Sequence, residues 1–119
     1  MTLSRPDELL PLTPQTLNVL LTLGHRTLHG YAIMQELEAR TEGREQLLPG
    51  SLYATIARMV KEGLIVEVKE SGEHSGGKRR REYRATAFGH EVARAEVSRL
   101  RGLIDFAQEQ NLAPAPEVP

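Results

Sequence analysis

Four consecutive cations form the densest cluster of chemically competent side chains in the sequence: Lys78, Arg79, Arg80 and Arg81. Residues 78–84 carry a net charge of +4, so the rest of the chain holds −5 of the total of −1. A sharply basic patch on an acidic chain can neutralise phosphate groups, and it is the electrostatic footprint of nucleic-acid binding. The same run is also compatible with a solvated surface segment.

Patterns for catalysis or metal binding are weak by comparison. The chain has no cysteine, which excludes a thiolate metal site and a cysteine nucleophile and fits a reducing cytoplasm. His25 and His29 are four residues apart, but they straddle a turn rather than share a helix face. Ser51 lacks the context of an activated nucleophile, and residues 72–78 lack the strand-loop-helix setting of a phosphate loop. We therefore expect no enzyme, no cofactor and no metal.

The composition is that of one ordinary globular domain. Of the 119 residues, 39% are hydrophobic and 26% are charged. No basic N-terminal region precedes an apolar run, and no apolar run approaches the roughly 20 residues of a membrane span. The sequence thus favours a cytoplasmic protein without a membrane partner. A chain this short buries one core, so a long helix would need a second subunit to cover it.

The elements that must position the basic run begin with a helix at residues 14–23. Thr13 can cap it, and Pro14 suits its first position. Its apolar residues are Leu17, Val19, Leu20, Leu21 and Leu23. They form a face wider than one stripe, which predicts a helix covered both by its own domain and by a second subunit. Gly24 is a natural stop, and residues 25–28 read as a short connection.

Two further helices are predicted at residues 30–40 and 51–63. The first has an apolar face made by Tyr31, Ile33, Met34 and Leu37. The second would begin with Ser51 as its cap. Its predicted core residues are Leu52, Ile56, Met59 and Val60, and its other faces carry Ser51, Tyr53, Ala54, Ala57, Arg58 and Lys61.

A β-hairpin follows the third helix. Residues 64–70 are β-branched and alternating, and residues 80–86 can return as the second strand, with Tyr83 and Ala85 on its buried face. Residues 71–79 contain Gly72, Gly76 and Gly77 and form the loop. The cations therefore lie where this loop rejoins the second strand.

The last predicted helix spans residues 87–110. Its heptad-like seam consists of Ala93, Val97, Leu100, Ile104 and Ala107. We predict a mainly α fold with a small β-hairpin (α+β), in four segments. They are an N-terminal arm (1–12), a winged helix-turn-helix DNA-binding domain (13–86), a C-terminal dimerisation helix (87–110) and a disordered tail (111–119).

Four short motifs in this order resemble the PadR family of transcriptional regulators over about residues 13–110. They are His29-Gly30-Tyr31, Pro49-Gly50-Ser51-Leu52-Tyr53, Glu62-Gly63-Leu64-Ile65, and Tyr83-Arg84-Ala85-Thr86 with Gly89 three residues beyond. The chain departs from the family pattern at Ala85, where a larger aliphatic residue is usual, and at Phe88 before the glycine. The single C-terminal helix resembles the short subfamily.

The resemblance implies a repressor that binds double-stranded DNA as a homodimer. A two-fold dimer presents two third helices to the duplex, which predicts an inverted-repeat operator. It implies that Ser51 and Tyr53 contact DNA, while the cations of the wing touch phosphates or the minor groove. Ser51 could instead only cap the helix, and Tyr53 could pack under the wing. Arg58 and Lys61 either contact DNA or are solvated.

Two further questions stay open at this point. A small-molecule effector of unknown identity is implied by the family, although a chain with no Trp and two Phe offers little for aromatic stacking. The alternative function is a winged-helix protein-interaction module that does not bind DNA. That alternative does not need four adjacent cations on the wing.

Overall fold

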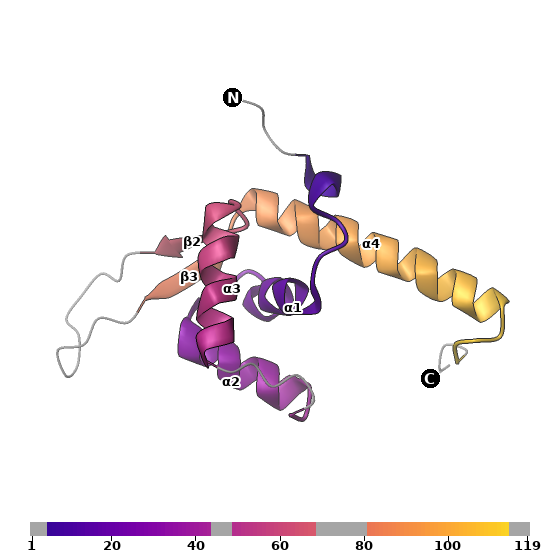
Figure 1. Ribbon diagram of the computed structural model, residues 1–119, viewed down its shortest axis with the longest axis horizontal. Helices are drawn as coiled ribbons and strands as arrows, with labels where there is room; N and C mark the ends of the chain where they lie inside the picture. Colours follow the sequence, from indigo (N-terminus) through magenta and orange to yellow (C-terminus); the bar gives the residue numbers. More distant parts are fainter. Residues whose placement is uncertain (1–4, 44–48, 69–80, 115–119) are drawn as a thin grey trace.

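The computed structural model describes residues 5–43, 49–68 and 81–114. Its first helix, α1 (Pro14–Leu23), begins as the sequence predicts, because the Thr13 side chain accepts a hydrogen bond from the Thr16 N–H. It ends at Gly24, whose φ of +54° lies in the left-handed region that favours glycine. In Figure 1, α1 lies in the middle of the fold, between α2 and α3 and the long α4.

The second and third helices, α2 (Gly30–Arg40) and α3 (Pro49–Lys61), pack against α1. In α3, Leu52, Ile56 and Met59 are buried as predicted. Val60 is 39% exposed, so its assignment to the core was wrong. Its position on the edge of the apolar stripe explains the error, because an apolar residue there can face either way.

Two other local expectations were also wrong. Ser51 lies inside α3, which begins two residues earlier at Pro49, so Ser51 is not the residue that precedes the helix. Tyr31 is 59% exposed at the start of α2 and does not belong to the core. A tyrosine at helical spacing with apolar residues fits a core pattern, yet its hydroxyl makes an exposed position equally acceptable.

The strands form one three-stranded antiparallel sheet in the order β1-β3-β2. The predicted hairpin is present as β2 (Ile65–Val68) and β3 (Glu82–Ala85), with Ile65 opposite Ala85. Tyr83 and Ala85 are both buried, as predicted. The third strand, β1 (Thr27–His29), occupies part of the segment that the sequence suggested was a plain connection. Three residues are too few for a period-2 pattern to show.

The core lies between the helices and the inner face of the sheet. It comprises Val19, Leu20, Leu23, Ile33, Leu37, Leu52, Ile56, Met59, Leu64, Ile65, Tyr83, Ala85 and Val92. The last of these belongs to α4 (Ala87–Glu109), so the N-terminal half of this helix is part of the same core. The C-terminal half extends away from the other elements (Figure 1).

A tight junction joins α4 to the base of the hairpin. Thr86 caps the helix by accepting from the Gly89 N–H, and its own hydroxyl donates to the Gly63 carbonyl at 2.6 Å. Its backbone N–H donates to the Leu64 carbonyl. A Cβ at Gly89 would stand 2.0 Å from that Leu64 oxygen. Only glycine therefore permits this approach of α4 to the chain after α3.

The N-terminal segment lies across α4. Within it, η1 (Pro6–Leu9) is a short 3-10 helix, and Leu9, Leu10 and Leu12 pack on the core. The sequence shows no period here, because the contacts are made by irregular chain. A hydrogen bond attaches this segment to α4: the Leu12 N–H donates to the Glu96 carboxylate at 2.9 Å. Glu96 belongs to α4 and is only 1% exposed.

The buried Glu96 carboxylate is paired with Arg99 one turn later. The Arg99 Nε donates to Oε1 at 2.5 Å and Nη2 donates to Oε2 at 3.0 Å. The hydrogen bonds from Arg99 lower the pKa of Glu96, the Leu12 N–H adds to this effect, and burial opposes it. None of the helices in the described ranges is both long and apolar enough to cross a membrane.

We expect Gly89→Ala to destabilise the fold by about 3 kcal/mol, because the new methyl group meets a backbone oxygen that cannot swing away. Gly102→Ala is the matched control on the same helix, since a Cβ there meets nothing within 4 Å. It should stabilise by about 0.5–1 kcal/mol through helix propensity. Urea unfolding at one fixed protein concentration measures both. Equal effects of the two substitutions would refute the close contact.

Glu96→Gln should cost about 2 kcal/mol at pH 7, because charge-assisted bonds to Arg99 are lost. The folded pKa of Glu96 lies below the ordinary value of 4.5, so its carboxylate stabilises the fold fully above that pH. This contribution is lost as the pH falls through the folded pKa. Unfolding measured from pH 7 to pH 3 should show wild type and variant converging. The exposed Glu91→Gln serves as control, and a constant gap across this range would contradict the assignment.

Candidate nucleic-acid interface

The four side chains of α3 singled out from the sequence all reach the surface. Ser51, Tyr53, Arg58 and Lys61 are exposed, and Tyr53 retains 51% of its accessible surface. They do not share one face, however. Ser51 and Arg58 lie on the flank that faces α1, Tyr53 lies on the flank that faces α2, and Lys61 points outward between them.

The α1 flank of α3 is held by a set of polar contacts. The Gln15 Oε1 accepts hydrogen bonds from Thr55 Oγ1 at 2.9 Å and from Ser51 Oγ at 3.4 Å. One turn later, Arg58 Nη2 donates to Thr16 Oγ1 at 2.6 Å. These contacts fix the rotation of α3 about its own axis. The sequence could not reveal them, because Gln15 and Thr16 are about 40 residues away from their partners.

Arg58 is further restrained on its own helix, because its Nε lies 3.7 Å from Glu62 Oε1. Lys61, by contrast, makes no hydrogen bond or ion pair with the part of the chain that the structure describes. The two cations that the sequence treated alike are therefore different. Arg58 is bonded to α1, whereas Lys61 is exposed to solvent.

On the opposite flank, the Tyr53 ring lies against the start of α2. A Cβ at Gly30 would come within 3.0 Å of Tyr53 Cε1 and 3.7 Å of its hydroxyl oxygen. Glycine at this position thus leaves room for the ring. This contact links two of the sequence motifs, one at the start of α2 and one at the start of α3. The ring remains half exposed beside α2.

Of the four wing cations, Arg81 alone is described, and Lys78, Arg79 and Arg80 lie outside the described residues. Arg81 is exposed, and its Nε lies 3.5 Å from Glu67 Oε1 on β2. The exposed Arg84 on β3 is a further cation that sequence reasoning did not select. Strand alternation was the available signal, because its neighbours Tyr83 and Ala85 face the core.

Three of the four histidines are described, and each has neighbours within the fold, while His74 lies outside the described residues. The rings of His25 and His90 lie 4.5 Å apart, and His90 Nε2 donates to the Gly24 carbonyl at 2.8 Å. His29 lies 3.5 Å from Glu82 across the sheet. Within residues 5–43, 49–68 and 81–114, no three His, Cys, Asp or Glu side chains come together as a metal site.

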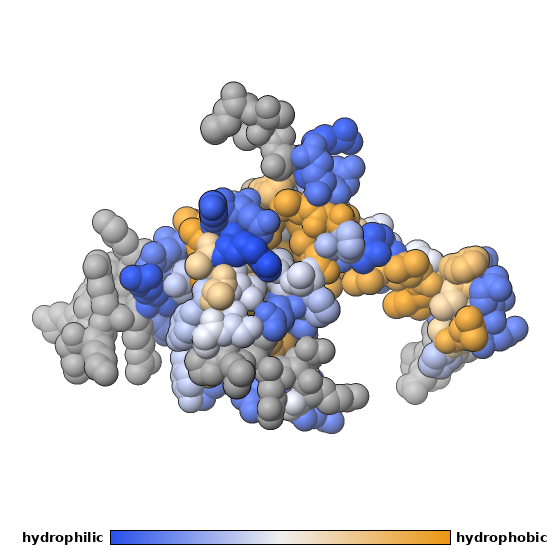
Figure 2. Space-filling model, viewed as in Figure 1, coloured by the Kyte–Doolittle hydropathy of each residue, from blue (hydrophilic) through white to orange (hydrophobic). Residues whose placement is uncertain are grey.

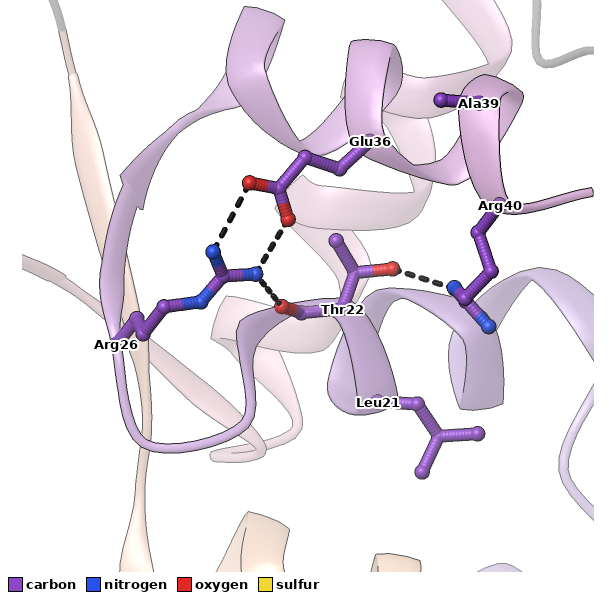
Figure 3. Close-up of a pocket in the computed structure, with 6 residues that line it drawn as sticks. All are labelled: Leu21, Thr22, Arg26, Glu36, Ala39 and Arg40. Carbon is purple, nitrogen blue, oxygen red and sulfur yellow. Dashed lines mark hydrogen bonds and ion pairs between the residues drawn. The ribbon is translucent and has the colours of Figure 1, made fainter.

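The polar side chains around a pocket between α1 and α2 bond to one another. Its lining consists of Leu21, Thr22, Arg26, Glu36, Ala39 and Arg40. Figure 3 shows Arg26 bridging both oxygens of Glu36, while Arg40 donates to the Thr22 hydroxyl at 2.7 Å. The Arg26 hydrogen bonds lower the pKa of Glu36. Its arginine and glutamate side chains already hydrogen-bond within the domain and its wall holds no aromatic ring, so this pocket offers little for an effector to bind.

The seam predicted on α4 lies along a helix with apolar residues open to solvent. Val97 is 38% exposed and Ile104 is 53% exposed, while Ala93, Leu100 and Ala107 are partly buried. Leu103 and Phe106, which the heptad spacing omitted, are 53% and 59% exposed. Figure 2 shows hydrophobic residues gathered along α4, from its contact with the N-terminal segment to its C-terminal end.

Leu21 of α1 stands beside this surface. It is 47% exposed and lines a groove with Ala93, Arg94, Val97, Ser98 and Arg101 of α4. The apolar residues of α1 therefore do extend beyond the face that packs in the core. One side packs in the domain core through Val19, Leu20 and Leu23, and Leu21 faces outward next to α4.

Comparisons with known proteins agree with this architecture. A model of the transcriptional regulator PadR-like family matches residues 19–95. A PadR family transcription regulator from hypervirulent Clostridium difficile R20291 has a similar structure, with 23% identity and a TM-score of 0.69, over 82% of this chain and 97% of that chain. No curated protein sequence matches.

Two further solved structures share the fold. RosR from H. salinarum is 28% identical with a TM-score of 0.60, over 82% of this chain and 79% of that chain. A PadR family transcriptional regulator from Eggerthella lenta DSM 2243 is 24% identical with a TM-score of 0.67, over 88% and 83% of the two chains. These likenesses confirm the winged-helix fold predicted from the sequence.

Lys61 and Arg58 have different surroundings, so replacing each by alanine should change the salt dependence of binding to duplex DNA by a different amount. Each phosphate contact contributes about −0.9 to the slope of log K against log salt. Lys61→Ala should flatten this slope by about 0.9 per protomer and leave stability unchanged. Arg58→Ala should change the slope less and cost about 1 kcal/mol of stability, because the bond to Thr16 is lost. An Arg58 variant with full stability and the larger slope change would contradict this distinction.

Proposed function

Because this chain belongs to the PadR-like family of transcriptional regulators, we propose that it represses transcription by binding an inverted-repeat operator as a homodimer. Membership in this family makes it a DNA-binding regulator rather than an enzyme. The proposal extends this to the direction of regulation, to the dimer and to the form of the operator. It also includes the sequence-based division into an arm (1–12), a DNA-binding domain (13–86), a dimerisation helix (87–110) and a tail (111–119).

The observation that carries the proposal is that α3 is held firmly by the domain and yet has one side exposed to solvent. The helix is exposed along its length on one side and fixed on the other by Gln15, Thr16 and the core. A helix held in this way can enter the major groove without losing order when it binds. Ser51 and Tyr53, near its N-terminal end, are the side chains that we propose to contact DNA there, with Arg58 and Lys61 further along.

The wing supports this arrangement. The strands β2 and β3 lead into residues 69–80, which contain Lys78, Arg79 and Arg80, and Arg81 follows directly. We propose that these cations contact phosphates beside the groove that α3 enters, which adds affinity without sequence preference. Arg81 contributes less than its neighbours in this proposal, because Glu67 already lies near its guanidinium.

The dimer is proposed from α4. Val97, Leu103, Ile104 and Phe106 are each more than a third exposed on one helix, which is costly for a monomer in water. The proposed interface consists of the predicted seam Ala93, Val97, Leu100, Ile104 and Ala107, widened by Leu21, Leu103 and Phe106. A two-fold axis through this surface makes the same patches meet from both protomers.

The direct test is selection of bound sequences from a random duplex pool, followed by footprinting of the selected site. We expect an inverted repeat whose half-sites lie about one helical turn, or a multiple of it, apart. Selection of a single asymmetric site that is fully protected at saturation would contradict the two-fold arrangement. If no sequence is enriched and the amount of DNA recovered does not depend on salt, the result would instead favour a protein-interaction module.

Substitution on the exposed face of α4 should separate the subunits. Ile104→Glu together with Leu100→Glu places charges in the proposed interface, and light scattering should show monomers or aggregates in place of dimers. Asp105→Asn, on the polar side of the same turn, is the matched control and should leave the dimer intact. An unchanged dimer in the double variant would move the interface elsewhere.

The compartment and the signal are part of the same proposal. We propose the cytoplasm as the site of action. The chain has no cysteine, so it has no disulfide bond that a reducing compartment would break. A small-molecule effector, if the operator is released by one, would then act outside the pocket lined by Arg26, Glu36 and Arg40, whose side chains already hydrogen-bond within the domain.

A further inference from the structure

The outermost face of α3 carries small side chains. Gly50, Ala54, Ala57 and Lys61 follow one another at intervals of four, three and four residues, which places them on one face of a helix. All four are exposed, and the buried Leu52, Ile56 and Met59 leave the helix on the opposite side. We call Gly50, Ala54, Ala57 and Lys61 the reading ridge.

The hydrogen-bonding side chains of α3 flank this ridge, and two of them bond to α1. Ser51 and Arg58 bond to Gln15 and Thr16 of α1 on one side. Tyr53 lies against Gly30 on the other side. Between the two flanks, the first two turns of the reading ridge offer only methyl groups and backbone. Lys61 is the first charged group along it.

The chemistry that fits such a ridge is the thymine C5-methyl group. It is the one apolar group that a base pair presents in the major groove, and alanine makes apolar contact with it. A small side chain also lets the helix backbone come closer to the bases. At Gly50, a Cβ would have no neighbour within 4 Å among the residues that the structure describes.

The spacing within the ridge sets the spacing of the bases. Ala54 and Ala57 are separated by three residues, or about 4.5 Å along the helix axis. Base pairs are about 3.4 Å apart along each strand. The two methyl groups can therefore contact neighbouring base pairs, or one base pair and the next but one, depending on how the helix crosses the groove.

We propose that Ala54 and Ala57 read thymine methyl groups, so that each half-site carries thymine at the two positions that face them. The inference rests on the proposed function, because it assumes that α3 enters the major groove. It assigns sequence preference at these positions to methyl contacts, while Lys61 and the wing supply contacts to the backbone of the duplex.

The test replaces thymine by uracil, which pairs identically and lacks only the C5-methyl group. A specific site is first selected from a random duplex pool with the full chain. Each thymine of a half-site is then replaced singly, and the affinity is measured. We expect a loss of about fourfold at the contacted positions, the value of one buried methyl group, and about sixteenfold when both half-sites are changed together. Uracil at other positions should have no effect.

Variants assign each methyl contact to a residue. With Ala57→Gly, the ratio of thymine to uracil affinities should fall to about one at a single position per half-site, and Ala54→Gly should do the same at the other. Val60→Ala, a loss of methyl groups from the edge of the same helix, is the matched control and should keep both ratios. Each ratio compares two duplexes with one protein, so a loss of folded protein in a variant cancels.

The outcomes separate this inference from the proposed function. Failure to enrich any site would overturn the proposed function, and this inference with it. An enriched inverted repeat whose affinity is the same with uracil at every position would overturn the methyl contacts alone. A uracil effect that persists unchanged in both glycine variants would also overturn them, because the methyl group would then be read by another residue.

Discussion

The close approach of Gly89 to the Leu64 carbonyl is the constraint on which the rest of the structure depends. It joins the first turn of α4 to the chain between α3 and β2, so the long helix leaves the winged domain in one direction. Thr86 reinforces this junction with bonds to Gly63 and Leu64, and His90 adds one to Gly24. The helix that would pair two subunits is thereby fixed relative to the helix that would read DNA.

Polar side chains of α3 also serve the fold. Arg58 and Ser51 are turned toward α1, where they set the rotation of α3 with Gln15 and Thr16. What remains outermost is a ridge of glycine, two alanines and a lysine. Rigid positioning of small groups favours shape and methyl recognition, whereas long flexible side chains would lose entropy on binding.

The sequence predicted the elements with strong local signals. The start of α1 at Thr13-Pro14, the α2 range, the hairpin and α4 follow from caps, periodicity and alternation, and the structure has all of them. It did not predict β1, Glu96 with Leu12, or the Gln15 contacts, because these depend on partners far along the chain. The misplaced Tyr31 and Val60 stand at the edges of apolar stripes, where spacing alone does not determine burial.

The most direct test of the central claim is a distance between the two α3 helices of a dimer. The chain has no cysteine, so Glu62→Cys introduces one spin-label site per protomer, directly after α3. Pulsed dipolar spectroscopy should give one narrow distance, near a turn of duplex DNA (about 34 Å) or a multiple of it. Gly89→Ala should shift or broaden this distance. A wild-type protein with no intermolecular distance, or a variant with the same narrow distance, would contradict the claim that this junction sets the geometry of DNA reading.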